Sequence, residues 1–212
     1  GVRNEEVISS ASRLHIESGS EFINRGEVGS EDTLSLSAFQ VSNEGVLGST
    51  RGQVTLQCEA LLANDDLIFS GSSIELFSVG SFTNRREVFA VSDLSLYSSH
   101  VVNTGLIRSS EGSMVLQVLG GSVENSDDQA TIMGQVSLSI TAVSLENAGF
   151  IVGGTNYLAN KLFLMDSLSN QRTMSSLGGW DISAMEVINQ GEISSSTGLY
   201  LKASTLDHHG RL

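Results

Sequence analysis

The 212-residue chain contains no proline and one cysteine, Cys58. Proline lacks the backbone N–H that a β-ladder uses, so its absence suits a chain in which almost every backbone N–H is paired. A lone cysteine excludes an internal disulfide and leaves the redox compartment undecided. No apolar run approaches the ~20 residues that a membrane-spanning helix needs, so no membrane span is expected.

Basic residues are also scarce. Eleven Lys and Arg stand against 24 Asp and Glu, which gives a formal net charge of -13. Because phosphate binding needs clustered cationic side chains, this balance argues against nucleic acid as a partner. The charge favours solubility but carries no information about the fold.

What the sequence does contain is one unit that recurs from end to end, most cleanly in residues 187–203, VINQGEISSSTGLYLKA. An Asn follows an apolar residue by two positions, and the spacing between successive members of this column, Asp207 included, runs from 18 to 23 with a mean near 20. Periods of this length are typical of solenoids. The Asn column consists of Asn4, Asn24, Asn43, Asn64, Asn84, Asn103, Asn125, Asn147, Asn170 and Asn189, with Asp207 in the last slot.

Three apolar columns accompany the Asn column. Two residues before each Asn stand Val2, Phe22, Val41, Leu62, Phe82, Val101, Val123, Leu145, Leu168 and Val187, and Thr205 breaks this column before Asp207. Four residues after it stand Ile8, Val28, Leu47, Ile68, Val88, Ile107, Ile151, Met174 and Ile193, with Ile132 replacing Gln129 after an insertion. Further on come the pairs Leu14/Ile16, Leu34/Leu36, Val54/Leu56, Ile74/Leu76, Leu94/Leu96, Met114/Leu116, Val136/Leu138, Leu162/Leu164, Trp180/Ile182 and Leu199/Leu201.

These columns give three short alternating strand signals per unit and no apolar period of 3.6 residues. Coiling the chain so that each strand lies parallel on its counterpart one repeat later buries one face of every strand. The sequence therefore predicts an all-β, parallel, right-handed β-helix solenoid of about ten coils with about 20 residues per coil, a rod of ~50 Å. A hexapeptide helix would keep a six-residue period and a leucine-rich repeat would turn helical, so both are disfavoured.

The Asn column is interpreted as structural, because stacked amides can bond to each other and to the backbone along the rod. Glycine follows the Asn by two residues at Gly26, Gly45, Gly105, Gly149 and Gly191. It is replaced at Glu6, Asp66, Arg86, Asp127 and Arg172. We expect those coils to turn differently or to accept strain, because a side chain at positive φ is costly.

Acidic pairs are candidates for glycosidase-type catalysis, because some parallel β-helices are polysaccharide lyases or hydrolases. Asp65/Asp66 and Asp127/Asp128 lie three coils apart, ~15 Å at strand spacing, too far to share one glycosidic bond. Glu31/Asp32 lacks an acidic partner at the same offset in the next coil. Arg85, Arg86 and Arg172 could contact an acidic sugar but do not converge with other groups. These residues are interpreted as solvated turn charges.

No residue is predicted to be catalytic, cofactor-binding or metal-ligating. His15, His100, His208 and His209 lack the spacing of a zinc site. Cys58 falls at the offset of Ala38 and Ala203 and is interpreted as a small core residue. Asp166 falls at that same inward offset, so either the strand has ended there or the Asp caps a turn. Trp180 either fills a widened coil or flips outward as an aromatic contact.

The repeated pattern resembles the haemagglutinin repeat of filamentous haemagglutinin-type exoproteins. Its best copies are residues 24–30 (NRGEVGS), 34–43 (LSLSAFQVSN), 43–49 (NEGVLGS), 103–110 (NTGLIRSS) and 189–203 (NQGEISSSTGLYLKA). That family includes two-partner-secretion adhesins, haemolysins and contact-dependent growth-inhibition effectors of Gram-negative bacteria. The resemblance covers the whole chain, and its specificity lies in the repetition, since each motif alone is common.

The resemblance implies a non-enzymatic shaft or recognition segment of a secreted filament on the bacterial outer cell surface. It would act in adhesion, cell contact or virulence, and could present a toxin domain outside the fragment. The alternative is a carbohydrate-active β-helix enzyme. The chain begins and stops mid-pattern, so residues 1–212 are expected to be a single β-helix segment, a fragment of a longer repeat protein. The expected partner is a cell-surface receptor protein or glycan, bound by an undetermined face, and open terminal coils predict end-to-end self-association. No cofactor is expected.

Overall fold

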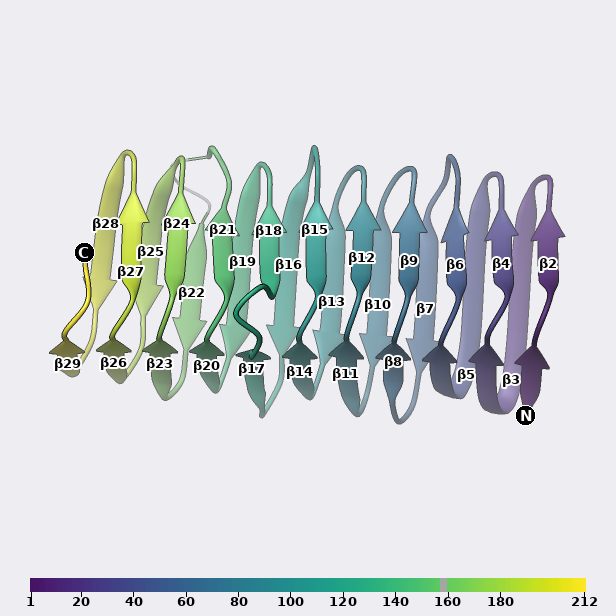
Figure 1. Cartoon of the computed structure of the whole chain (residues 1–212), viewed down its shortest axis with the longest axis horizontal. Coiled ribbons are helices and arrows are strands. Elements are labelled where there is room, and N and C mark those ends of the chain that lie inside the picture. The colour runs from purple at the N-terminus through teal and green to yellow at the C-terminus, as the bar shows by residue number, and fades with distance from the viewer. Residues whose placement is uncertain (157–159) are drawn as a thin grey trace.

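The computed structural model describes residues 1–156 and 160–212, and within them all regular structure is β. The chain winds into about ten stacked coils, one for each strand of the 10-stranded sheet. The two termini lie at opposite ends of the rod (Figure 1). In Figure 1 the chain rises through the near strands, passes over the top and descends through the faded far strands as it advances from right to left. This winding is right-handed, the hand that parallel β-crossovers adopt. The predicted β-solenoid is confirmed.

Each coil contributes strands to three rows. Row B contains β2 (Val7–Ser10), β4 (Glu27–Ser30), β6 (Val46–Ser49), β9 (Leu67–Ser70), β12 (Glu87–Ala90), β15 (Leu106–Ser109), β18 (Thr131–Gly134), β21 (Phe150–Gly153), β24 (Thr173–Ser176) and β27 (Glu192–Ser195). Row A1 contains the first parts of β3 (Arg13–Asn24) and β5 (Thr33–Asn43), then β7 (Val54–Cys58), β10 (Ile74–Ser78), β13 (Leu94–Ser98), β16 (Ser113–Val118), β19 (Ser137–Ala142), β22 (Lys161–Leu164), β25 (Gly179–Ser183) and β28 (Gly198–Lys202). Row A2 contains β1 (Val2–Asn4), the last parts of β3 and β5, then β8 (Leu62–Asn64), β11 (Ser81–Asn84), β14 (His100–Asn103), β17 (Ser122–Asn125), β20 (Ser144–Asn147), β23 (Ser167–Asn170), β26 (Glu186–Asn189) and β29 (Thr205–His208).

Every strand pairs in parallel with its counterpart in the next coil, so residues about 20 apart in sequence become neighbours. Rows A1 and A2 form one 19-stranded sheet and row B forms a 10-stranded sheet. The register aligns like with like, as in Leu76 opposite Leu96 and Val88 opposite Ile107. The rod therefore has three corners. The serine corner follows row B, the apolar corner lies between A1 and A2, and the Asn corner follows A2.

The interior is filled by the apolar columns that the alternation predicted. Inward residues such as Val28, Leu56 and Val101 are fully buried, while their neighbours along each strand face outward. Burying one such side chain stabilises the fold by roughly 1.5–3 kcal/mol. Ile132 pairs with both Ile107 and Ile151, so it does take over from Gln129 after the insertion.

Two of the expected apolar pairs are wrong in register. Met114 and Leu116 lie opposite Leu138 and Ile140, so the inward pair is Leu138/Ile140, while Val136 is 37% exposed. In the next coil Leu162 lies opposite Ile140 and Leu164 opposite Ala142. The expected pairs Val136/Leu138 and Leu162/Leu164 are therefore each displaced by two residues from their predicted columns. Extra residues before each of these two strands shift the position at which its inward-outward alternation begins. The types of residue in the strand do not show this shift.

In that coil the first inward position belongs to Asn160, a buried polar residue where neighbouring coils carry Leu138 and Trp180. The Asn160 Oδ1 accepts bonds from the backbone N–H groups of Leu138 at 3.0 Å and Gly154 at 2.8 Å. Its Nδ2 donates to Gly154 O, Asn156 O and Ser176 Oγ at 2.9–3.2 Å. These bonds compensate the cost of burying an amide in the core.

The predicted alignment of the last coil is wrong by one residue. Asn189 pairs with His208, not with Asp207, and Val187 pairs with Leu206, so the apolar column is not broken by Thr205. With His208 as its partner, Asn189 is followed by an interval of 19 residues, the same as that between Asn170 and Asn189.

The prediction of backbone strain at Asn-corner positions that lack glycine is also wrong. Among the described residues the single positive φ belongs to Gly120, at 82°, which lies at another corner. Glycine at the Asn corner instead permits close stacking, since a Cβ on Gly191 would lie 1.9 Å from the carbonyl oxygen of Arg172 in the preceding coil.

Candidate functional site

The ten asparagines of the predicted column form a continuous buried ladder. Each is at most 6% exposed. The Nδ2 of each donates to the Oδ1 of the next at 2.7–2.8 Å, from Asn4 through to Asn189. At the C-terminal end the Nδ2 of Asn189 lies 3.1 Å from Nδ1 of His208.

The second hydrogen of each amide goes to the backbone of the Asn corner. Asn103 is representative: its Nδ2 donates to Gly105 O at 2.9 Å and to Thr131 O at 3.2 Å, and its Oδ1 accepts from the Gly105 N–H at 3.3 Å. A buried polar group without a partner costs roughly 1–3 kcal/mol, so each missing member would leave its neighbours unsatisfied. The ladder is inaccessible to ligands, and its geometry suits the support of the turn.

The acidic pairs do not assemble into a catalytic site. Asp65 and Asp127 follow β8 and β17, which are separated by the intervening pairings through β11 and β14. The Asp65 Oδ1 forms an ion pair with the Arg85 guanidinium at 2.6 Å, and the Asp127 Oδ1 accepts a hydrogen bond from the Gln129 N–H at 2.9 Å.

Glu31, Asp32 and Arg172 also have local partners. Glu31 pairs with Arg51, and Asp32 accepts from Ser12 Oγ at 3.3 Å. The Arg172 guanidinium lies 5.1 Å from the centre of the Phe150 ring. Asp166 is exposed in a bend after β22, so the strand has ended before it.

His15 and His100 lie in different coils from each other and from the adjacent pair His208 and His209. His15 is exposed, and His100 contacts Ser122 Oγ at 2.9 Å and Glu124 at 3.5 Å. His208 terminates the Asn ladder, and His209 lies 2.9 Å from Asp207. Within residues 1–156 and 160–212, no cluster of three or more His, Cys, Asp or Glu side chains is placed to hold a metal ion.

Cys58 is 1% exposed and lies opposite Ala38 and Ser78 on the inner side of the apolar corner. Burial raises the pKa of its thiol, and the hydrogen bond to Ser78 Oγ at 3.3 Å lowers it by a smaller amount. A buried thiol held protonated is a poor nucleophile, which agrees with its interpretation as a small core residue. No helix long and apolar enough to cross a membrane occurs in the part of the chain that the structure describes.

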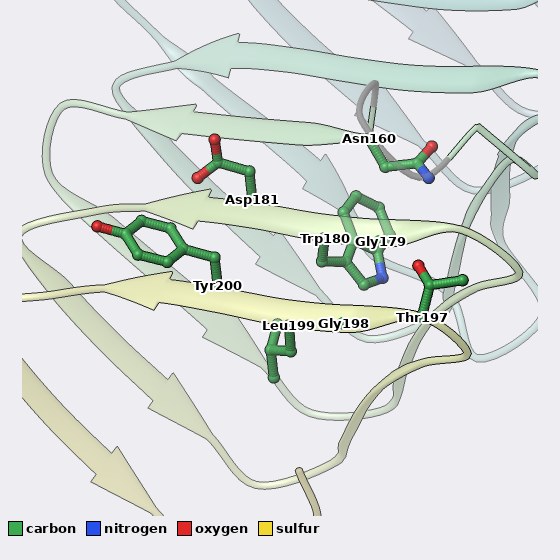
Figure 2. A pocket seen from close by; sticks show the side chains of 8 residues that line it. All are labelled: Asn160, Gly179, Trp180, Asp181, Thr197, Gly198, Leu199 and Tyr200. Atoms are coloured by element: carbon green, nitrogen blue, oxygen red, sulfur yellow. The ribbon is translucent and has the colours of Figure 1, made fainter.

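Trp180 faces inward at 2% exposure, and its Nε1–H has no hydrogen-bond partner. Beside it is a surface hollow of about 400 Å³, lined by Asn160, Gly179, Trp180, Asp181, Thr197, Gly198, Leu199 and Tyr200 (Figure 2). Gly179 and Gly198 are register partners, so two successive outward positions carry no side chain, and Asp181 and Tyr200 stand beside them. Because the Trp180 nitrogen is fully screened from solvent, a ligand in the hollow would not contact it in this conformation.

Two buried polar features escaped the sequence analysis. Asn160 was missed, although the long interval between Asn147 and Asn170 pointed to an irregular coil. A serine column at the serine corner was also missed. Ser49 illustrates it: its Oγ donates to Asp32 O at 2.9 Å and accepts from the Gly52 N–H at 3.1 Å. Its members are Ser30, Ser49, Ser70, Ser109 and Ser176. The recurrence of serine at the end of most row B strands was the available signal, although β12 ends at Ala90, β18 at Gly134 and β21 at Gly153.

Comparison with known proteins gives one relationship. No family model matches the chain, and no solved structure matches it. The chain is similar to the tRNA nuclease CdiA of Yersinia mollaretii, with 25% identity over 202 residues. This alignment covers 93% of the chain but only 6% of that protein. The weak homology to CdiA over most of the chain, together with the β-solenoid, is consistent with a filamentous haemagglutinin-type repeat region.

Proposed function

We propose that this chain is a non-enzymatic shaft or recognition segment of a secreted bacterial surface filament. The observation that carries the proposal is the continuous register of about ten coils, whose interior is closed by apolar columns and by the Asn ladder. Such a rod supplies length, ~50 Å for this segment at 4.8 Å per coil. The similarity to CdiA along 93% of the chain supports a role in a filament of that kind.

The nuclease activity in the relative's name describes a protein of which this chain matches 6%. We place any such activity outside the segment. The absence of converging charges in the described coils supports this, because the acidic pairs are separated by three coils and are engaged locally. In this proposal the rod displays or projects, and a toxin domain would be carried elsewhere in the parent protein.

The proposed partner is a receptor protein or glycan on a cell surface, contacted by outward side chains of several adjacent coils. The purified chain would be tested for saturable binding to intact bacterial and epithelial cells and to a glycan panel. Binding that persists at moderate salt identifies a recognition segment, and its absence identifies plain shaft. Cleavage of any glycan would overturn the non-enzymatic assignment and support a carbohydrate-active β-helix instead.

Three matched substitutions identify the face used for binding. Glu27, Glu75 and Glu146 are exposed outward residues on rows B, A1 and A2 respectively. Each would be changed separately to Lys, which alters the net charge equally in all three variants. Loss of cell binding in one variant with retention in the other two assigns the face. Equal weakening in all three would indicate a general electrostatic effect.

A further inference from the structure

Exposed apolar side chains on this rod are concentrated at the apolar corner. In the six coils from β10 to β25, the corner presents the last outward residue of each A1 strand and the residue two positions later. Seven of these side chains are between 37% and 62% exposed: Phe77, Val79, Tyr97, Leu119, Phe163, Met165 and Met185. The other positions of this surface are Ser99, Gln117, Thr141, Val143 and Ser183, so none of its twelve positions is charged. Two exposed carboxylates, Asp166 and Glu186, directly follow Met165 and Met185 at the edge of the corner.

The surface is continuous along the rod. Phe77 is the register partner of Tyr97, and the same row of partners continues through Gln117 and Thr141 to Phe163. Adjacent coils are ~4.8 Å apart, so each apolar side chain lies within one or two coils of the next. The result is a straight apolar strip on the outside of the solenoid.

The apolar strip is larger than the apolar patches found on the surface of most monomeric proteins. With about half of a roughly 200 Å² side chain exposed at each position, the seven residues expose about 700 Å². The largest apolar patch of a typical monomer is about 300–600 Å². One side of a stable protein–protein interface is about 800 Å². The strip therefore matches what a partner of standard interface size would cover.

The outer face of row B is a weaker candidate. Its large side chains, including Phe69, Phe89 and Phe150, are only partly exposed, and Phe69 is the register partner of Phe89. Two are also covered by cations, with Arg108 4.4 Å from the Phe89 ring centre and Arg172 5.1 Å from that of Phe150. That face already has partners within the chain.

We propose that two copies of this chain pair along the apolar corner with their rods antiparallel. Two straight strips with the same coil spacing can stay in register over all six coils, and a two-fold axis makes the contact self-complementary. With the axis between β16 and β19, β10 faces β25 and β13 faces β22 of the other copy. Leu119 then faces Val143, and Tyr97 faces the coil of Phe163 and Met165.

Charge at the two ends of the strip favours the antiparallel arrangement. The corner of the β7 coil carries the exposed Glu59, and that of the β28 coil carries the exposed Lys202. Antiparallel pairing brings β7 opposite β28, so Glu59 of each copy meets Lys202 of the other. Parallel pairing would place Glu59 against Glu59 and Lys202 against Lys202, which is unfavourable.

Sedimentation equilibrium of the 212-residue chain tests the pairing. Leu119→Glu, at 62% exposure, introduces a charge into the strip, and Leu177→Glu, at 64% exposure, makes the same change at the serine corner. We expect a dimer whose dissociation constant rises at least about tenfold in Leu119→Glu, since buried central contacts dominate binding. Leu177→Glu should behave as the unmodified chain, and circular dichroism melting should show both variants folded.

A charge exchange tests the orientation. Glu59→Lys should weaken the dimer, and Glu59→Lys combined with Lys202→Glu should restore it. A chain that is monomeric at all concentrations, or a dimer unaffected by Leu119→Glu, overturns the proposal. Open-ended oligomers that ignore both changes would indicate end-to-end joining of β27 to β2 instead. A dimer weakened by Leu119→Glu but not by Glu59→Lys would overturn the antiparallel orientation, because parallel pairing would only exchange a Glu–Glu contact for a Lys–Lys contact.

Discussion

The Asn corner and the apolar corner both border row A2, yet they are built differently. At the Asn corner every A2 strand through β26 ends at an Asn, and the chain turns over an unbroken ladder of amides. At the apolar corner β3 and β5 run through the bend as single strands. The inner position there changes along the rod, from Ala38 and Cys58 to Ser78.

The difference shows what each corner requires of its inner residue. A ladder amide must donate to the coil on one side and accept from the coil on the other, so only Asn satisfies all its neighbours. The inner residue of the apolar corner need only fit the available space. Ser98, Val118 and Leu164 all occupy it. One column is therefore uniform within this chain and the other varies.

Asn103→Asp should give the largest loss of stability. A carboxylate would accept from the Asn84 amide but would face the Oδ1 of Asn125 without a proton to donate. An uncompensated buried charge costs about 3–5 kcal/mol. Burial should raise the pKa of this carboxyl in the folded state, so the loss relative to the unmodified chain should grow as pH rises above about 4. Urea unfolding at acidic and neutral pH measures it, and a pH-independent loss would contradict the reasoning.

Asn103→Leu should cost less, about 2–4 kcal/mol, because two amide groups lose a partner but no charge is buried. The Asn84 Nδ2 keeps a bond to Leu106 O at 3.2 Å, which limits the loss. The matched control is Ser42→Leu, which places the same side chain on the outer face of row A2. Equal urea midpoints for the two variants would show that the ladder does not stabilise the rod.

Cys58→Ser at the apolar corner should cost only about 1 kcal/mol, since serine already occupies the neighbouring position 78. Because burial raises the pKa of the Cys58 thiol, the unfolded chain loses that proton first as pH increases. The unmodified chain should therefore lose stability above about pH 8.5. Cys58→Ser should lose less over the same interval. Thermal melts between neutral and alkaline pH test this, and identical alkaline losses would disprove it.

Arg85→Ala on the outside of the Asn corner should have the smallest effect, about 0.2–1 kcal/mol. Arg85 and Asp65 form an ion pair at 2.6 Å, but the arginine side chain is 65% exposed and water screens the attraction. The difference from the unmodified chain should disappear at high salt. A larger, salt-insensitive loss would mean that the outer charges help to hold the turn.

The repeat predicted most of the architecture because its columns are redundant. Ten copies of an Asn with apolar residues at fixed offsets specify which side chains face inward. Where one copy is ambiguous, the copies on either side of it still indicate the alignment. Prediction failed where an insertion changed the phase of a strand, as at Val136 and Leu162, and at the last coil, where His208 takes the expected place of Asp207. Residue type alone does not show how much chain a turn uses.

The sequence by itself determined the solenoid, the three rows and the identity of the buried Asn column, because hydrophobic periodicity and amide chemistry are local properties that repeat. The tertiary structure decided which residues meet across coils, since the distance between coils is fixed by backbone hydrogen bonding and not by sequence spacing. It placed Asn160 in the core and gathered seven exposed apolar side chains, from Phe77 to Met185, into one strip. Those side chains lie in separate turns along the chain, and only the stacking of the coils brings them onto one corner.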